Sequence, residues 1–332
     1  MKLKVNRNVC KAACILVVAL LIGVLLLKLL SEWETRHDIV DVLQSNEPND
    51  GRLYLDGKCY VPNKDLEAVL LIGVDKYEAQ TQGEGYNNTQ QSDFLLLLLM
   101  DKQSKTCKAL HINRDTMTDI PVLGVRGEKA GTIKGQLALA HTYGSGGLDS
   151  CRNTVEAVSN LLYGVKIDHY IAFTMDAVAK INDLAGGVTV TVQDDMTSVS
   201  PDMYKGATVT LNGDMALAYV RARGQLEDSS NLRRMERQRQ YMKELRSAMT
   251  AKTESDETFI LKALNSVSKY MTSDCTINQL SRMYDHWKIY ADSSILTMEG
   301  EAKKGAEFME FYPDDNALRQ LVANLFYIPI DE

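Results

Sequence analysis

Two apolar runs separated by a polar loop decide the fold. They read Leu66-Glu-Ala-Val-Leu-Leu-Ile-Gly-Val-Asp75 and Asp93-Phe-Leu-Leu-Leu-Leu-Leu-Met100. A third apolar run, residues 106–113, follows after a short loop and ends at Arg114 and Asp115. Nearly continuous apolar runs of this length predict strands that are covered on both faces.

Charged residues stand where these three runs would meet. If consecutive runs pair antiparallel, Asp75, Asp93, Arg114 and Asp115 lie at one edge of the sheet. Two neighbouring carboxylates repel each other unless a cation lies between them, and their oxygens suit Mg²⁺. An acid at a strand end is most often only solvated, but the convergence of three strands weighs against that interpretation. Asp75 and Asp93 are therefore candidate magnesium ligands.

The rest of the chain alternates strand-like and helix-like segments without a Pro/Gly/Ser-rich boundary. A strand over 169–173, a helix over 176–184 and a strand over 188–192 predict a right-handed parallel crossover. Further helices are expected over 136–143, 148–163, 214–220 and 232–249. The pattern predicts an α/β fold with a mixed central sheet and helices on both faces.

Arginines are concentrated in one short segment of an otherwise acidic protein. Within the predicted helix, Arg234, Arg237 and Gln238 follow the i, i+3, i+4 spacing that places side chains on one face. Guanidinium groups offer paired donors that match phosphate oxygens. A solvated, salt-bridged helix face is the competing interpretation, although Arg221 and Arg223 follow an apolar stretch that is expected to be packed. The arginines between 221 and 239 are Arg221, Arg223, Arg233, Arg234, Arg237 and Arg239.

The N-terminus predicts a membrane anchor over residues 12–30. At roughly 1.5 Å per residue, this apolar segment spans about 28 Å, close to the thickness of a bilayer core. Basic residues precede it and acidic residues follow it, so residues 1–11 are expected in the cytoplasm and the body outside. The competing interpretation, a cleaved signal peptide, lacks a small-residue cleavage signature after the apolar run.

Charge and cysteine content narrow the possible functions. The chain has a formal charge of −7, and the first 31 residues hold five basic and no acidic residues. The remainder has 32 basic against 44 acidic residues, a formal −12, which makes a general nucleic-acid binder a poor interpretation. The body has four cysteines that would form two disulfides or remain buried thiols, and both alternatives stay open. They are Cys59, Cys107, Cys151 and Cys275.

Several motifs in register resemble the LytR-CpsA-Psr family of membrane-anchored cell-wall proteins. Order and spacing agree from about residue 66 to 250, which is the motif core of a catalytic domain expected over 65–332. Residues 31–64 would be a stalk or linker, and 251–332 the C-terminal part of the domain. The matching stretches are residues 70–75, 91–93, 112–116, 140–144, 184–190, 211–223 and 234–238.

The resemblance implies an extracytoplasmic enzyme of a Gram-positive-type cell envelope. It would transfer a glycan phosphate from a polyprenyl-pyrophosphate carrier to peptidoglycan, attaching a polymer of the teichoic acid or capsule type. Asp75 and Asp93 match the family's magnesium-site acids, and Asp115 stands beside Arg114 in the expected catalytic set. The positions that match the pyrophosphate-binding residues are Arg114, Arg221, Arg223, Arg234 and Gln238.

Two positions depart from the family pattern. Gln91 stands where the family usually has arginine, and Gln136 stands where it usually has lysine. Both departures remove positive charge near the expected pyrophosphate, and Lys76 and Lys134 are candidates for the compensating cations.

Two alternatives belong to other functional classes. One is a membrane-anchored binding or regulatory protein of the cell envelope, although the acidic body carries no recognisable DNA-reading motif. The other is a hydrolase that uses the same metal edge to cleave a polyprenyl-pyrophosphate glycan, with water as the acceptor.

Overall fold

The computed structural model describes residues 51–75, 90–124, 126–144, 146–222, 231–289 and 291–330. The predicted anchor over 12–30, Lys76 and Arg223 lie outside these ranges. Among the described residues, no helix has the length and apolar character needed to cross a membrane. The chain divides into two compact units, residues 1–54 and 55–332. The second unit carries the sheet and helices that follow.

Strands occur throughout the described part of the chain, and its α-helices lie between Gly147 and Phe326. The strands are β1 (Leu53–Leu55), β2 (Lys58–Pro62), β3 (Leu66–Val74), β4 (Ser92–Asp101), β5 (Thr106–Ile112), β6 (Met117–Leu123), β7 (Lys129–Gln136), β8 (His169–Phe173), β9 (Val188–Thr191), β10 (Thr208–Leu211), β11 (Met271–Ser273), β12 (Ala291–Thr297), β13 (Gly300–Lys304), β14 (Met309–Pro313) and β15 (Tyr327–Ile330). The helices are α2 (Gly147–Leu161), α3 (Met175–Leu184), α4 (Gly213–Arg221), α5 (Asn231–Ser255), α6 (Phe259–Val267), α7 (Ile277–Ile289) and α8 (Asp315–Phe326), with 3-10 turns η1 (Leu137–Ala140) and η2 (Ser268–Tyr270).

A six-stranded mixed sheet forms the centre, in the order β11-β8-β3-β4-β5-β12. The three apolar runs are its middle strands, and β3, β4 and β5 pair antiparallel as predicted. β8 lies parallel beside β3, and β12 lies parallel beside β5. The expected mixed sheet is confirmed.

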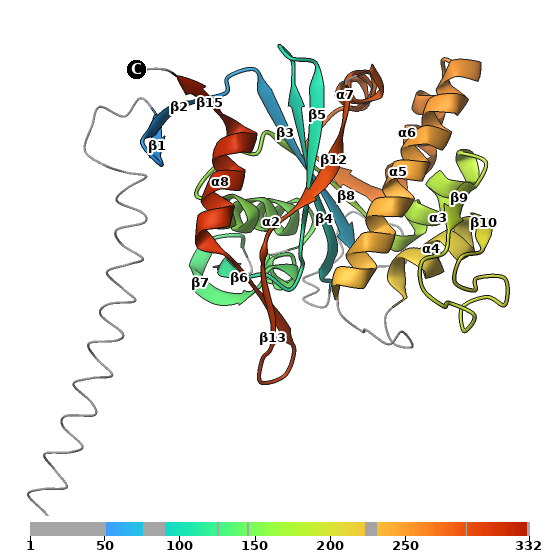
Figure 1. The fold of residues 1–332 in the computed structure, drawn as a ribbon, viewed down its shortest axis with the longest axis horizontal. Helices are drawn as coiled ribbons and strands as arrows, with labels where there is room; N and C mark the ends of the chain where they lie inside the picture. Colours follow the sequence, from blue (N-terminus) through green and yellow to red (C-terminus); the bar gives the residue numbers. More distant parts are fainter. Residues whose placement is uncertain are drawn as a thin grey trace, which may run out of the picture. The chain divides into compact units, whose positions relative to one another are not determined.

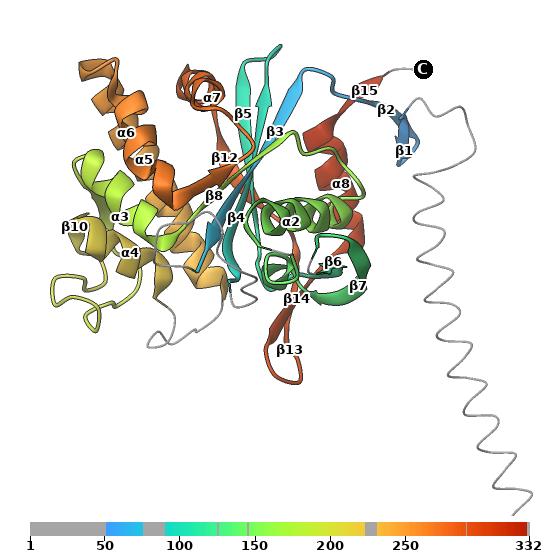
Figure 2. The same cartoon turned by 180° about the vertical axis from the view of Figure 1, so that it is seen from behind.

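Helices cover both faces of this sheet (Figures 1 and 2). On one side, α2 and α8 lie against alternate residues of the middle strands, among them Leu70, Leu95 and Leu97, all fully buried. On the other side lie α3, α5, α6 and α7, near the remaining residues of those strands. The predicted arrangement of helices on both faces is therefore present.

The predicted parallel crossover from β8 to β9 is wrong. β9 leaves the central sheet and pairs antiparallel with β10 in a separate two-stranded sheet. Gly186 and Gly187, both with positive φ, turn the chain away after α3. Alternate residues of β9 are buried and exposed, a pattern typical of a strand with one solvated face.

A second correction concerns the helix expected over 136–143. Gln136 is the last residue of β7, and only the short turn η1 follows it, so most of this segment is not α-helical. The long helix expected from 232 is confirmed as α5, which starts one residue earlier and extends to Ser255.

The four cysteines of the body are free thiols. Cys59, Cys107 and Cys151 are buried, and Cys275 is partly exposed. The structure therefore settles the open alternative in favour of thiols.

Candidate active site

The end of β3 and the start of β4 meet at the predicted edge. The backbone N–H of Asp75 donates to the carbonyl of Gln91 over 3.1 Å. In return, Gln91 N–H donates to Oδ1 of Asp75 over 2.7 Å. This reciprocal pair fixes Asp75 beside the segment that leads into Asp93.

Arg114 is the centre of the edge. It follows β5, is only 9% exposed, and forms an ion pair with Asp93. Its Nε lies 3.3 Å from Oδ1 of Asp115, and its Nη2 donates to Oε1 of Gln91 over 2.6 Å. Two carboxylates and an amide oxygen therefore hold one buried guanidinium group in a fixed orientation, as the convergence of the three strands predicted.

A second buried arginine reaches the same carboxylate from helix α5. Nη1 of Arg234 lies 3.7 Å from Oδ1 of Asp93, and the side chain is 4% exposed. Asn231, the first residue of α5, accepts a hydrogen bond from Arg234 and donates to Oδ1 of Asn113 over 2.6 Å. The start of α5 is thereby tied to the end of β5, and Asp93 is shared by two guanidinium groups.

The arginines do not all serve this edge. Arg237, 1% exposed, pairs with Asp194 over 3.0 Å and donates to backbone carbonyls at the end of α4. It therefore fastens α5 to the β9–α4 region. Arg221 is exposed at the last turn of α4, and Arg223 lies outside the described residues. Of the predicted pyrophosphate set, the structure brings Arg114 and Arg234 together.

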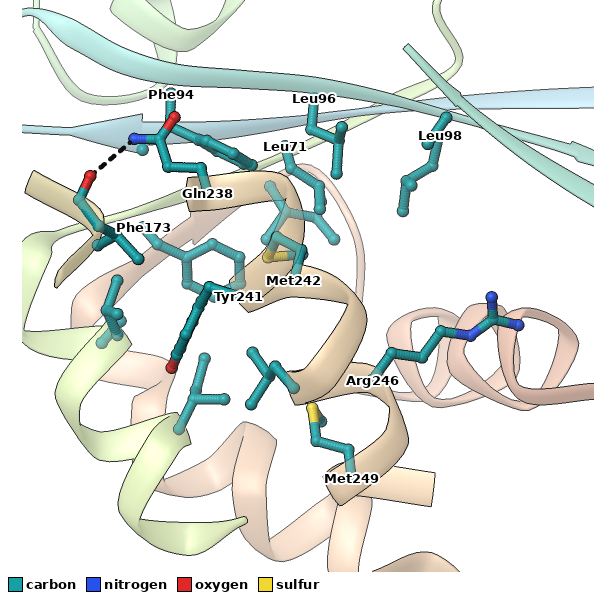
Figure 3. A pocket seen from close by; sticks show the side chains of 18 of the residues that line it. Leu71, Phe94, Leu96, Leu98, Phe173, Gln238, Tyr241, Met242, Arg246 and Met249 are labelled. Atoms are coloured by element: carbon teal, nitrogen blue, oxygen red, sulfur yellow. Dashed lines mark hydrogen bonds between the residues drawn. The ribbon is translucent and has the colours of Figure 1, made fainter. Parts of the chain in front are cut away.

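Gln238 lies one turn further along α5, against the cavity described below. Its Nε2 donates to the carbonyl of Val220 over 3.1 Å (Figure 3). Its Oε1 is buried and has no hydrogen-bond partner within the described part of the chain. An unsatisfied buried acceptor is costly, so such a group is often completed by a ligand or water.

The two positions that depart from the family pattern are both engaged. Gln91 orients Arg114, as above. Nε2 of Gln136 lies 3.4 Å from Oδ1 of Asp115 and donates to the carbonyl of Met309 over 2.6 Å. Lys134 is exposed on β7 opposite Asp119, and Lys76 lies outside the described residues. Their compensating role stays a prediction.

Three residues of the site were not predicted from the sequence. Asn113 and Asn231 link β5 to α5, and Asn231 could have been found only because asparagine is a favoured residue just before a helix. His111 lies on β5 beside the Phe94 ring, with 5.0 Å between the ring centroids. Burial, together with the positive charges of Arg239 and Arg234, lowers the His111 pKa to about 3. A neutral imidazole therefore stands beside the arginines.

An apolar cavity of about 1010 Å³ adjoins the edge. It lies between the sheet and helices α3, α5, α6 and α7, and Asp93, Arg221, Arg234 and Arg239 also belong to its lining. Figure 3 shows Leu71, Leu96, Leu98, Phe94 and Phe173 of the sheet facing Tyr241, Met242 and Met249 of α5. A cationic end and an apolar body suit a molecule with an anionic head and a hydrocarbon tail.

Comparisons with known proteins show the family and the fold of the chain. The model of the LytR_cpsA_psr family matches residues 30–326. A Bacillus anthracis protein, polyisoprenyl-teichoic acid–peptidoglycan teichoic acid transferase TagU, is 29% identical over 268 residues, 80% of this chain and 79% of its own length.

Solved structures share the fold. Bacillus subtilis TagV superposes with a TM-score of 0.58 at 26% identity, covering 79% of this chain and 96% of its own. TagT bound to LI-WTA superposes with a TM-score of 0.59 at 22% identity, covering 80% and 90%.

Proposed function

This chain belongs to the LytR-CpsA-Psr family, and from that premise we propose that it attaches a teichoic-acid-type polymer to peptidoglycan. In this reaction an acceptor hydroxyl of peptidoglycan attacks the phosphorus next to the glycan of a polyprenyl-pyrophosphate donor. A new phosphodiester forms, the pyrophosphate bridge breaks, and polyprenyl phosphate leaves. The TagU relative supports the proposal through its name and its coverage of most of this chain.

The observation that carries the proposal is the pair of buried arginines at the mouth of the apolar cavity. Arg114 and Arg234 converge on Asp93 from β5 and α5, and Asp93 and Arg234 both belong to the cavity lining. Guanidinium groups offer paired donors that match phosphate oxygens. A pyrophosphate bound at this place would meet both arginines while its lipid entered the apolar cavity.

The two guanidinium groups would stabilise the charge that develops during transfer. Both are oriented before substrate arrives. Gln91 and Asp115 hold Arg114, and Asn231 holds Arg234. Oriented donors in a site shielded from water stabilise a charged transition state because little reorganisation is needed when charge moves.

Asp75 and Asp93 fit a magnesium ion by their donor chemistry. Both are partly exposed carboxylates at the sheet edge, and Mg²⁺ is usually held by one or two carboxylates together with substrate phosphates. When bound, the ion would neutralise charge on the pyrophosphate oxygens. We include Mg²⁺ dependence in the proposal for this reason.

The location of the protein is also part of the proposal. The apolar segment over 12–30, with cations before it and acids after it, supports a single membrane anchor with residues 31–332 outside. An enzyme held at the membrane surface would meet a lipid-linked donor on one side and the wall on the other.

The experiment uses the full-length chain in detergent with a polyprenyl-pyrophosphate glycan, peptidoglycan and Mg²⁺. We expect phosphodiester-linked glycan on peptidoglycan, and its loss when the divalent ion is chelated. Arg234→Lys should lower the transfer rate by roughly 100-fold, because it keeps the charge but loses the paired donors. The matched control is Arg233→Lys, since the neighbouring Arg233 is exposed, and a surface ion pair such as that with Glu236 contributes little.

Each outcome assigns a function. Release of free glycan phosphate without transfer would replace the proposal with the hydrolase. Tight binding of the donor without turnover would identify a binding protein. Equal loss of transfer in Arg234→Lys and Arg233→Lys would remove the buried arginine from the mechanism.

A further inference from the structure

A group of potential metal ligands lies at the end of the sheet opposite the candidate active site. His169 begins β8, and Asp274 and Cys275 follow β11 on the neighbouring edge strand. Glu67 stands near the start of β3, eight residues before Asp75, which corresponds to roughly 26 Å along an extended strand. The group is therefore separate from the edge that holds Asp93 and Arg114.

Three side chains of this group can each offer one ligand atom to the same point. The nitrogen, carboxylate oxygen and sulfur atoms of His169, Asp274 and Cys275 all lie within 4.8 Å of one another. Nδ1 of His169 is 3.5 Å from Oδ2 of Asp274, and Sγ of Cys275 is 3.6 Å from Oδ1. Bonds of about 2.0–2.3 Å from each atom to a common ion would require only a small contraction of this triangle.

The two ring nitrogens of His169 have different surroundings. Nδ1 faces Asp274, is buried, and finds no hydrogen-bond partner among the residues that the structure describes. Nε2 faces Glu67, with 4.0 Å between Nε2 and Oε1, and the other oxygen of Glu67 pairs with Lys102 over 2.9 Å. A metal-bound histidine typically presents its second ring N–H to a carboxylate, which fixes the tautomer and orients the ring. Glu67 is placed for that task.

Asp274 is itself held in position by the backbone. Its Oδ1 accepts a hydrogen bond from the N–H of Tyr170 over 3.1 Å, which ties the carboxylate to the strand that carries His169. The hydroxyl of Ser273 donates to the Tyr170 carbonyl and accepts from the N–H of Cys275. Two hydrogen bonds thus fasten the end of β11 and the loop after it to β8, and a third holds Cys275 against Ser273, so two of the ligands come from a fixed loop.

We propose that His169, Asp274 and Cys275 bind a divalent transition-metal ion of the Zn²⁺ type, with Glu67 orienting the imidazole. A sulfur, an imidazole nitrogen and one carboxylate oxygen suit Zn²⁺, whereas Mg²⁺ prefers oxygen ligands alone. Three protein ligands leave a coordination position for water or another small ligand. A pocket of about 500 Å³, lined by His169, Asp274 and Arg152 among others, opens beside the cluster and offers a path for the ion.

The test uses the untagged full-length chain in detergent, stripped of metal and titrated with Co²⁺ and then Zn²⁺. Co²⁺ should bind in one equivalent with a thiolate-to-metal charge-transfer band and the visible absorption of a low-symmetry site. Zn²⁺ should displace it. The sulfur band separates this site from any ion held by Asp75 and Asp93, where the described ligands are oxygens.

Three variants test the assignment. Cys275→Ser should remove the charge-transfer band, and Glu67→Gln should keep the band but weaken Zn²⁺ affinity by about 10-fold to 100-fold. The matched control Cys59→Ser replaces another thiol of the body and should retain both band and affinity. A wild-type chain without the band, or a band that survives in Cys275→Ser, would overturn the proposal. Glycan transfer does not enter this readout, so the result is independent of the proposed function.

Discussion

Strand β4 presents leucine to both faces of the sheet, yet the two faces differ in their surroundings. Leu95, Leu97 and Leu99 are fully buried under α2 and α8. Leu96 and Leu98 line the cavity on the opposite face, together with residues of α5 and α7 (Figure 3). The same residue type therefore supports a packed core on one side and a binding surface on the other. The difference arises from what covers the strand, not from the strand itself.

The packed face should be the more sensitive to truncation. Leu97→Ala should lower the free energy of unfolding by about 3 kcal/mol, because it removes buried methyl groups and leaves a cavity. Leu98→Ala on the cavity face should cost about 1 kcal/mol or less, because that side chain is only partly buried and borders the cavity. Urea unfolding of both variants measures the difference. Equal costs would mean that the two faces are equally packed.

Acid should lower the free energy of unfolding through two buried histidines, one on each side of the sheet. Burial lowers the pKa of His111 on the cavity face to about 3 and that of His141 beneath α2 to about 4. In the unfolded chain both titrate near 6.5, so below that pH only the unfolded state gains protons and stability falls. At pH 5 each histidine should cost about 2 kcal/mol relative to pH 7.

Histidine variants separate the two contributions to the acid effect. Unfolding at pH 7 and pH 5 should show a smaller difference in His111→Gln and in His141→Gln than in the wild type. A pyrophosphate analogue should reduce the loss at His111 alone, because an anion near Arg234 offsets the positive charge that helps lower this pKa. An unchanged pH dependence in the double variant would contradict the assignment.

Filling the cavity should affect transfer more than stability. Leu98→Trp places a larger apolar side chain where the hydrocarbon tail is proposed to lie. It should lower kcat/KM by about tenfold with a long polyprenyl donor, which corresponds to about 1.4 kcal/mol. With a short-chain donor the loss should be much smaller. An equal loss with both donors would show that the cavity does not hold the tail.

A glycine on the cavity face gives the smallest expected effect. A Cβ at Gly73 would lie 2.9 Å from the Cβ of Phe94, so Gly73→Ala must shift Phe94 and should cost about 1 kcal/mol. The matched control is Gly131→Ala on β7, where a Cβ would meet nothing within 4 Å. Its unfolding free energy should stay equal or rise slightly. An unchanged free energy of unfolding in Gly73→Ala would show that Phe94 can shift at little cost.

The sheet edge could be predicted because its signal is local. Each of the three apolar runs ends or begins at a charged residue, and antiparallel pairing alone brings Asp75, Asp93 and Arg114 together. The pairing of β9 with β10, outside the central sheet, could not be predicted in the same way. A strand, a helix and a strand in succession usually make a parallel crossover, and the alternating exposure that excludes this for β9 depends on α4 and α5 packing on one face.

The partners of the two buried arginines of α5 could not be predicted from the sequence. Helical spacing placed Arg234 and Arg237 on one face, and both are buried, but they serve different partners. Arg234 reaches Asp93, whereas Arg237 reaches Asp194, a residue of the loop after β9. Helical periodicity predicts the direction in which a side chain leaves the helix. It does not predict which residues of the rest of the chain lie in that direction.

Two strands near the end of the chain, β12 and β15, pair with strands that are synthesised much earlier. β12 pairs with β5, and β15 pairs with β2, although more than half of the chain separates the partners. During synthesis from the N-terminus, β5 emerges long before its neighbour and offers an unpaired apolar edge, which is prone to association with other chains. The nascent protein must therefore be kept apart from its copies until its last residues arrive. A chain that stops before Tyr327 would lack the strand that closes on β2, so premature termination near the C-terminus should be as damaging as a deletion inside the domain.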